Sequence, residues 1–124
     1  MKFQPDTTSG VNLISRHEGA RIWVGTVPFD ASIVVPWKGE PLAWDAPGFE
    51  ALTAAHFERI AALAPEVVVF GSGSRLRFPH PSLLRSLIDS GIGVETMDTG
   101  AACRTYNVLA GELRAVVAAL LIGG

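Results

Sequence analysis

The sequence of 124 residues has one cysteine, no long apolar run and no excess of basic residues. Because Cys103 is alone, no internal disulfide can form. The longest apolar run, residues 115–122, is too short for a membrane-spanning helix, which needs about 20 residues. Ten lysines and arginines against twelve acidic residues give a net charge of −2, which excludes the basic surface that nucleic-acid binding requires. We therefore expect no nucleic-acid partner and no membrane-spanning segment.

Metal ligands and targeting signals are equally scarce. His17, His56 and His80 are scattered without the spacing of metal ligands, so the sequence predicts no metal site and no cofactor. The first residues lack the apolar stretch of a signal peptide and the arginines of a transit peptide, which favours a cytoplasmic protein. Residues 1–10 are polar and predict a loosely ordered arm.

Apolar segments are abundant in the rest of the chain. Hydrophobic residues make up 48% of it, enough to bury one core, which predicts a single domain over residues 1–124. Short β-branched runs predict strands, the first two of which form a hairpin or lie as two adjacent strands. These strands are expected at 11–15, 21–25, 31–37, 41–44, 66–70 and 92–97.

Periodic spacing predicts three helices. The first runs over 47–63, where apolar residues recur every three or four positions. The second contains Leu83, Leu84, Leu87 and Ile88, and the third runs from Thr99 to Ala110 with Asp98 or Thr99 as its N-cap. The last segment, 113–121, fits either a helix or a buried strand, since periodicity cannot separate the two.

A parallel βαβ unit follows from the order of these elements. Strand 66–70, a helix and strand 92–97 predict parallel strands with a right-handed crossover. The loops that leave the two strands, "GSGSRLRFP" and "DTGAACR", then lie at the same carboxyl edge of the sheet. Ligands of open α/β sheets bind at this edge.

The first candidate site is the glycine-rich loop from Gly71 to Arg77. Its backbone N–H groups are suited to cradling an anion, with arginines supplying charge. The alternative is an ordinary tight turn that leaves a buried strand, because the loop matches neither the dinucleotide fingerprint nor a P-loop. The candidate ligand-binding residues here are Gly71, Ser72, Gly73, Arg75 and Arg77.

The second candidate site is "MDTGAACRTYN", residues 97–107. Asp98 and Thr99 precede a helix whose first turn offers unpaired N–H groups, and Arg104 lies one turn further on. Cys103 near this helix N-terminus and beside Arg104 is a candidate reactive thiol with a lowered pKa. The alternative is architecture: Asp98 caps the helix, Cys103 is a small buried residue, and the small side chains allow close packing on the sheet. No histidine partner is spaced for catalysis by Cys103, so we assign no catalytic residue.

Residues 67–121 resemble the Mth-type domain family, long described as a domain of unknown function. The resemblance is carried by the Gly-x-Gly turn followed by "RFP" and by "MDTGAACRTYN" with its trailing apolar strand. It implies a three-layer α/β fold with a central mixed β-sheet that contains the βαβ unit and ends in an antiparallel final strand over 113–121. The family's recurring positions correspond to Gly71, Gly73, Asp98, Thr99, Ala101, Ala102, Thr105, Tyr106 and Asn107.

Two functions remain open from the sequence. Since members of the family include a mitochondrial assembly factor for respiratory complex I, the resemblance implies a non-enzymatic binding or assembly module with a protein partner. Such a module should expose an apolar or aromatic patch, for which Trp23, Trp37 and Trp44 are candidates. The alternative is a protein that binds a small anion, or an enzyme, with its site between Gly71–Arg77 and Asp98–Arg104.

Overall fold

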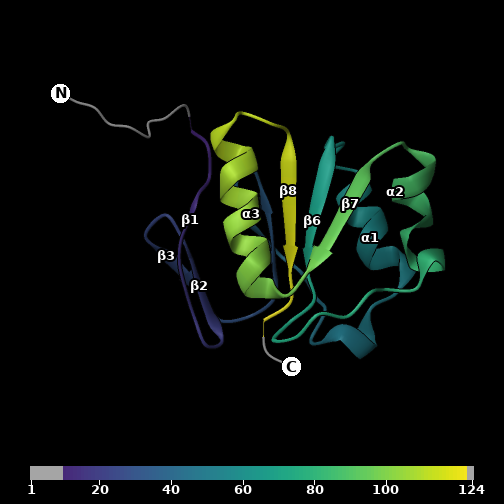
Figure 1. Ribbon diagram of the computed structural model, residues 1–124, viewed down its shortest axis with the longest axis horizontal. Helices are drawn as coiled ribbons and strands as arrows, with labels where there is room; N and C mark the ends of the chain where they lie inside the picture. The colour runs from purple at the N-terminus through teal and green to yellow at the C-terminus, as the bar shows by residue number, and fades with distance from the viewer. Residues whose placement is uncertain (1–9, 123–124) are drawn as a thin grey trace.

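A computed structural model describes residues 10–122 and shows a central β-sheet with further elements on both faces (Figure 1). The order of strands across the sheet is β5-β4-β8-β6-β7. These strands are β4 (Ile33–Pro36), β5 (Leu42–Ala43), β6 (Val67–Gly71), β7 (Gly93–Met97) and β8 (Val116–Leu120). The predicted N-terminal arm, apart from Gly10, lies outside the described residues.

The mixed sheet and its βαβ unit are confirmed. β6 and β7 pair in parallel, with Val67 opposite Gly93. The final strand, β8, is antiparallel to β4, and it is also parallel to β6, a contact that the sequence did not reveal. This second contact arises because α3 (Thr99–Gly111) carries the chain from β7 back across β6. The carboxyl ends of β6, β7 and β8 therefore meet at one edge.

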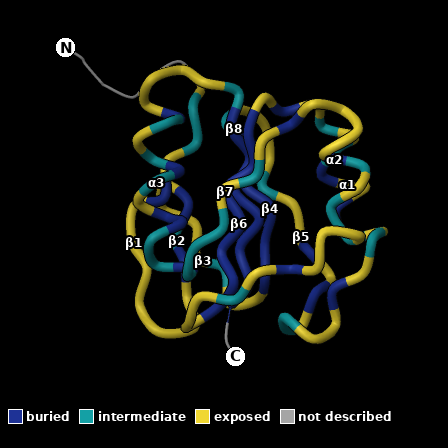
Figure 2. Tube along the Cα trace, turned by 45° about the vertical axis from the view of Figure 1, so that its right-hand side comes forward, coloured by how far each residue is buried: buried dark blue, intermediate teal, exposed yellow. Residues whose placement is uncertain are grey.

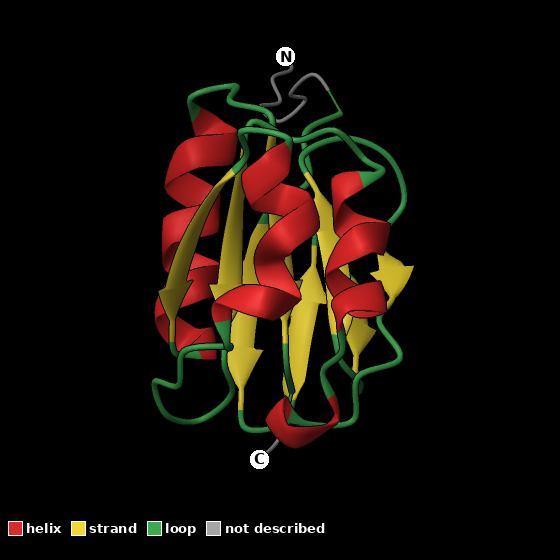
Figure 3. Cartoon of the chain, turned by 90° about the vertical axis from the view of Figure 1, so that its right-hand side faces the viewer, coloured by secondary structure: helices red, strands yellow, loops and turns green. Residues whose placement is uncertain are grey.

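The helices lie on both faces of the sheet (Figures 1 and 3). One face carries α1 (Ala54–Ala61), α2 (Arg85–Asp89) and the short 3-10 helices η1 (Phe49–Ala51) and η2 (Pro81–Leu84). The other face carries α3 together with a second sheet. That sheet is made of β1 (Ile14–Glu18), β2 (Arg21–Val24) and β3 (Val27–Phe29). β1 and β2 form a hairpin, and its first strand begins three residues later than predicted.

The predicted helix over 47–63 is wrong in its extent. The chain forms η1, then becomes extended at Leu52, with φ −68° and ψ 138°, before α1 begins. The break occurs because α1 begins with its own N-cap at Thr53, whose backbone N–H donates to Nδ1 of His56 at 2.9 Å. Apolar spacing continues across this interruption, so periodicity alone could not show it.

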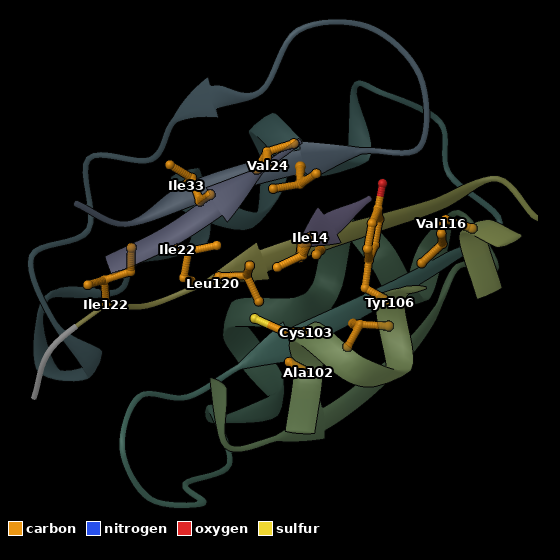
Figure 4. Packing of buried hydrophobic residues seen from close by; sticks show 14 of the residues in the cluster. Ile14, Ile22, Val24, Ile33, Ala102, Cys103, Tyr106, Val116, Leu120 and Ile122 are labelled. Carbon is orange, nitrogen blue, oxygen red and sulfur yellow. The ribbon is translucent and has the colours of Figure 1, made fainter. Parts of the chain in front are cut away.

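Alternation along the fully buried strand β6 builds two cores. Val67 and Val69 face α3 and the small sheet, whereas Val68 and Phe70 face α1 and α2. Figure 4 shows the first core, with Tyr106 and neighbouring side chains of α3 packed against residues of the small sheet. Figure 2 shows buried residues running along the central strands and exposed residues on the outer turns. None of the helices between residues 10 and 122 is long and apolar enough to cross a membrane.

Candidate functional site

Thr99 fills the space between the carboxyl ends of β6, β7 and β8. Its backbone N–H donates to the Gly73 carbonyl oxygen at 2.9 Å. Its hydroxyl accepts a hydrogen bond from the Gly73 N–H at 2.9 Å and donates one to the Leu121 carbonyl oxygen at 2.7 Å. The two predicted loops do lie together, as the βαβ unit requires, and they are joined by these hydrogen bonds.

Gly71 permits this close contact. A Cβ atom built on Gly71 would lie 2.9 Å from Cα and from Oγ1 of Thr99, and 3.1 Å from the Cβ of Ala102. Real side chains do not approach so closely. The glycine at this position therefore allows α3 to pack on β6, which supports the architectural interpretation.

The rest of the glycine-rich loop is closed by its own hydrogen bonds. The buried hydroxyl of Ser72 donates to the Arg75 carbonyl oxygen at 2.7 Å and accepts from the Arg77 N–H at 3.0 Å. The guanidinium of Arg77 donates to the Ser72 carbonyl oxygen at 2.8 Å and lies 4.9 Å from the centre of the Phe49 ring. Arg77 thus stabilises the loop, and Arg75 is exposed.

A hollow of about 430 Å³, the edge hollow, lies beside Thr99 on the α3 side of the sheet. Three of the predicted residues line it: Gly73, Asp98 and Thr99. Its other walls come from the turn between β1 and β2, which brings His17, Gly19 and Ala20, and from Ser74, Gly100, Leu121 and Ile122. The sequence did not identify His17 because only the docking of the hairpin places it here.

Cys103 and Arg104 line a different, neighbouring hollow of about 320 Å³. They share it with His17, Gly100 and residues of β1. The predicted site is therefore divided: Arg104 lies at one hollow, Asp98 and Thr99 line the other, and Arg77 is held against Phe49. The candidate residues of the alternative anion site are thus distributed around two neighbouring hollows that share His17 and Gly100.

The first turn of α3 is stabilised by its N-cap. Asp98 is the N-cap and its carboxylate accepts a hydrogen bond from the Ala101 N–H at 2.9 Å, as one of the sequence interpretations predicts. The predicted lowering of the Cys103 pKa is wrong: burial raises the pKa of this thiol to about 11, outweighing the opposing charge of Arg104. A buried thiol that stays protonated is a poor nucleophile.

The tryptophans do not form the expected exposed patch. Trp44 is 3% exposed and its indole N–H donates to the His56 carbonyl oxygen, while Trp37 packs against both cores. Trp23 lies beneath the guanidinium of Arg16. The most exposed apolar side chain between residues 10 and 122 is instead Phe78, at 69%.

Phe78 belongs to the loop that connects β6 to η2. Leu76 in the same loop is 53% exposed, and Arg75 beside it is also exposed. Sequence reasoning read "RLRF" as part of an anion loop, so it missed the apolar side chains that alternate with the arginines. Within the described part of the chain, no group of three histidine, cysteine or acidic side chains is placed to hold a metal ion.

Comparisons with known proteins agree with this architecture. The chain is 38% identical over 80 residues to NADH dehydrogenase [ubiquinone] 1 alpha subcomplex assembly factor 3 of Bos taurus, a match that spans 63% of this chain and 44% of that protein. It is 30% identical over 67 residues to a 13 kDa major membrane protein of Francisella tularensis, covering 54% of each.

Among solved structures, the chain is similar to a Mth938-like domain from Bordetella pertussis. The TM-score is 0.85 and the identity 32%, with 100% of this chain and 94% of that chain covered. The profile of a family described as proteins of unknown function (DUF498/DUF598) matches residues 14–121. The chain therefore has a Mth938-like fold and belongs to the DUF498/DUF598 family.

Proposed function

We propose that this chain is a non-enzymatic, cytoplasmic binding module that helps to assemble a membrane-bound respiratory complex. The observation that carries the proposal is the exposed pair Leu76 and Phe78 in the loop after β6. Two large apolar side chains on one short loop are typical of a contact surface, because leaving them in water is unfavourable. The similarity to complex I assembly factors supports a role in the assembly of such a complex. The partner we propose is a protein that takes part in this assembly.

The loop presents these side chains on a rigid support. Its start is fixed by the hydrogen bonds of Ser72 and Gly73 to the end of β7 and the beginning of α3. Its end is fixed by His80, which accepts a hydrogen bond from the Ser82 N–H and caps η2. A loop held at both ends loses little conformational entropy when it binds, which favours affinity.

The exposed side chains of the loop indicate what kind of surface can bind it. Phe78 and Leu76 fit an apolar pocket, and the exposed guanidinium of Arg75 favours acidic groups on the rim of that pocket. Burial of a side chain such as Phe78 contributes about 1.5–3 kcal/mol to binding. We do not include catalysis in this function, since the thiol of Cys103 is buried and its pKa is raised.

Site-specific photocrosslinking tests the proposal. p-Benzoylphenylalanine in place of Phe78 should crosslink one protein, identified by mass spectrometry as a subunit or assembly factor of a membrane complex. The same amino acid at Val108, which is 60% exposed on α3, is the matched control and should not crosslink it. Leu76→Ser should reduce the yield at position 78 without unfolding the protein. Equal crosslinking from both positions would contradict the proposal.

A further inference from the structure

The outer strand β7 has an unpaired edge. Among residues 10–122, β7 pairs with β6 alone and ends the five-stranded sheet. Figure 1 places β7 at the outside of the central sheet, beside α2. The backbone groups that point away from β6 are therefore available to an additional strand.

The other sheet edges are protected in ways that β7 is not. β5 has only two residues, and β3 has three with Pro28 at its centre. β1 has an irregularity after Ile14, and the side chain of Asn107 binds both backbone groups of Ile14. β7 has five residues without proline or irregularity. Proteins protect their edge strands against pairing, and apart from the charge of Glu95 β7 has none of these protections, so its edge is a candidate binding surface.

On the α3 face of the sheet, the side chains of β7 leave room for the side chains of a strand added at its edge. Val94 packs against the core below α1 and α2, and Met97 packs against the core below α3. By the alternation of a strand, Gly93 and Glu95 lie on the same face as Met97. A Cβ built on Gly93 would have only one neighbour within 4 Å, the Cγ2 of Val67 at 4.0 Å. An incoming strand can place a side chain over this open position.

Glu95 determines the charge of the strand that fits. It is exposed at the centre of β7 and forms no ion pair with any residue between 10 and 122. Opposite charges on adjacent strands stabilise pairing, and like charges disfavour it. A second copy of the chain that paired with Glu95 opposite Glu95 would bring two carboxylates together, whereas a basic segment would neutralise this one.

We propose that β7 is a strand-addition site for an extended, basic segment of a partner protein, with a lysine or arginine facing Glu95. This inference rests on the binding role proposed above and adds the form in which the partner is bound. The loop with Leu76 and Phe78 begins at the carboxyl end of β7, where Ser72 donates its N–H to the Met97 carbonyl oxygen on the side that faces β6.

Model peptides test the site without a known partner. The probe is acetyl-Thr-Val-Lys-Val-Thr-amide, and the same peptide with glutamate at its centre is the charge control. We expect the lysine peptide, at millimolar concentration, to shift the backbone amide resonances of Gly93–Met97 in the ¹⁵N-labelled protein. The glutamate peptide should bind about two- to five-fold more weakly, the range expected of a cross-strand charge pair.

A charge exchange provides the stricter test. Glu95→Lys should reverse the preference so that the glutamate peptide binds better, while Glu40→Lys, the same change on an exposed loop, should leave it unaltered. The proposal is overturned if neither peptide shifts the β7 resonances, if residue 95 does not alter the preference, or if these resonances shift with protein concentration alone, which would assign the edge to a second copy. The peptides do not involve Phe78. A negative peptide result would therefore overturn the strand-addition site alone, and crosslinking at Phe78 would still test the proposed function.

Discussion

The Thr99 hydroxyl donates a hydrogen bond to the Leu121 carbonyl oxygen at 2.7 Å, which joins the first turn of α3 to the end of β8. The hydroxyl oxygen of Thr99 also accepts a hydrogen bond from the Gly73 N–H, so one buried side chain connects the exits of β6 and β8. This bond places Thr99 at the carboxyl edge of the sheet, where open α/β sheets bind ligands. In this chain the Thr99 side chain joins the strand ends there and also lines the edge hollow.

Thr99→Val should destabilise the protein by about 1–3 kcal/mol, because the change keeps the shape but leaves buried polar groups of Gly73 and Leu121 without their partner. The free energy of unfolding in urea measures the effect. Thr105→Val, on the same helix, is the control and should change stability by less than about 0.5 kcal/mol. Equal losses in both variants would show that the hydroxyl of Thr99 has no special role.

Gly71→Ala should destabilise the protein by about 1–3 kcal/mol, since the added Cβ would lie 2.9 Å from Cα of Thr99. Gly100→Ala is the contrasting change: in α3 the added Cβ would lie no closer than 3.4 Å to its neighbours, and alanine favours a helix by about 0.5–1 kcal/mol. Thermal unfolding of both variants should therefore move in opposite directions. A stable Gly71→Ala variant would contradict the close packing of α3 on β6.

The positions of β6, β7 and α3 were predictable because local patterns determine them, whereas the place of β8 beside β6 was not. The buried run at Val67–Gly71 and the cap at Asp98 each depend on neighbours in sequence, whereas the apolar run at Val116–Leu120 also fitted a helix. The break before Thr53 was not predictable from spacing, because the cap by His56 competes with a continuous apolar face. Local hydrogen bonding decided that boundary.

The candidate site was predictable only as a location. The βαβ unit correctly brings Gly73 and Thr99 together, but the directions of Arg77 and Arg104 depend on tertiary contacts. Arg77 lies on Phe49, a residue of a distant segment, and no sequence pattern specifies that contact. The same holds for the burial of Cys103, which reverses the pKa shift expected from its position near a helix N-terminus.

Cys103 should react with iodoacetamide about a hundredfold more slowly in the native protein than in urea at pH 8. Its pKa is about 11 in the folded protein against an ordinary 9.0, and the thiolate is the reactive form. Rates of alkylation measured by mass spectrometry test this. A native rate equal to the rate in urea would show that the thiol is accessible and ionised normally.

The same pKa shift makes stability depend on pH. Because the folded pKa of Cys103 is raised, its contribution is complete below about pH 9 and is lost as the pH rises towards 11, by about 2–3 kcal/mol for two pKa units. Burial also raises the pKa of Tyr106, which adds a loss in the same direction. The difference in unfolding free energy between the natural protein and Cys103→Ala, measured from pH 8 to 11, isolates the cysteine part and should shrink with pH. A difference independent of pH would contradict the shift.

Asn107→Ala should release β1 from α3. The side chain of Asn107 accepts from the Ile14 N–H at 2.8 Å and donates to the Ile14 carbonyl oxygen at 2.7 Å, so its loss leaves both groups without these bonds. We expect a loss of about 1–3 kcal/mol and faster hydrogen exchange at the Ile14 amide. Val108→Ala, an exposed neighbour, should change neither measurement.

β1 ends in the turn that forms one wall of the edge hollow, so the Asn107 variant also tests how that wall is held. If β1 is positioned mainly by Asn107, the resonances of His17 and Gly19 should broaden or shift in Asn107→Ala, while those of β7 and of the loop carrying Phe78 remain unchanged. Unchanged His17 resonances would mean that the apolar contacts of Ile14 and Ile22 with the core hold the hairpin without the side-chain bonds. The two surfaces proposed for binding lie on the central sheet and its loop, so they should keep their function when the hairpin loosens.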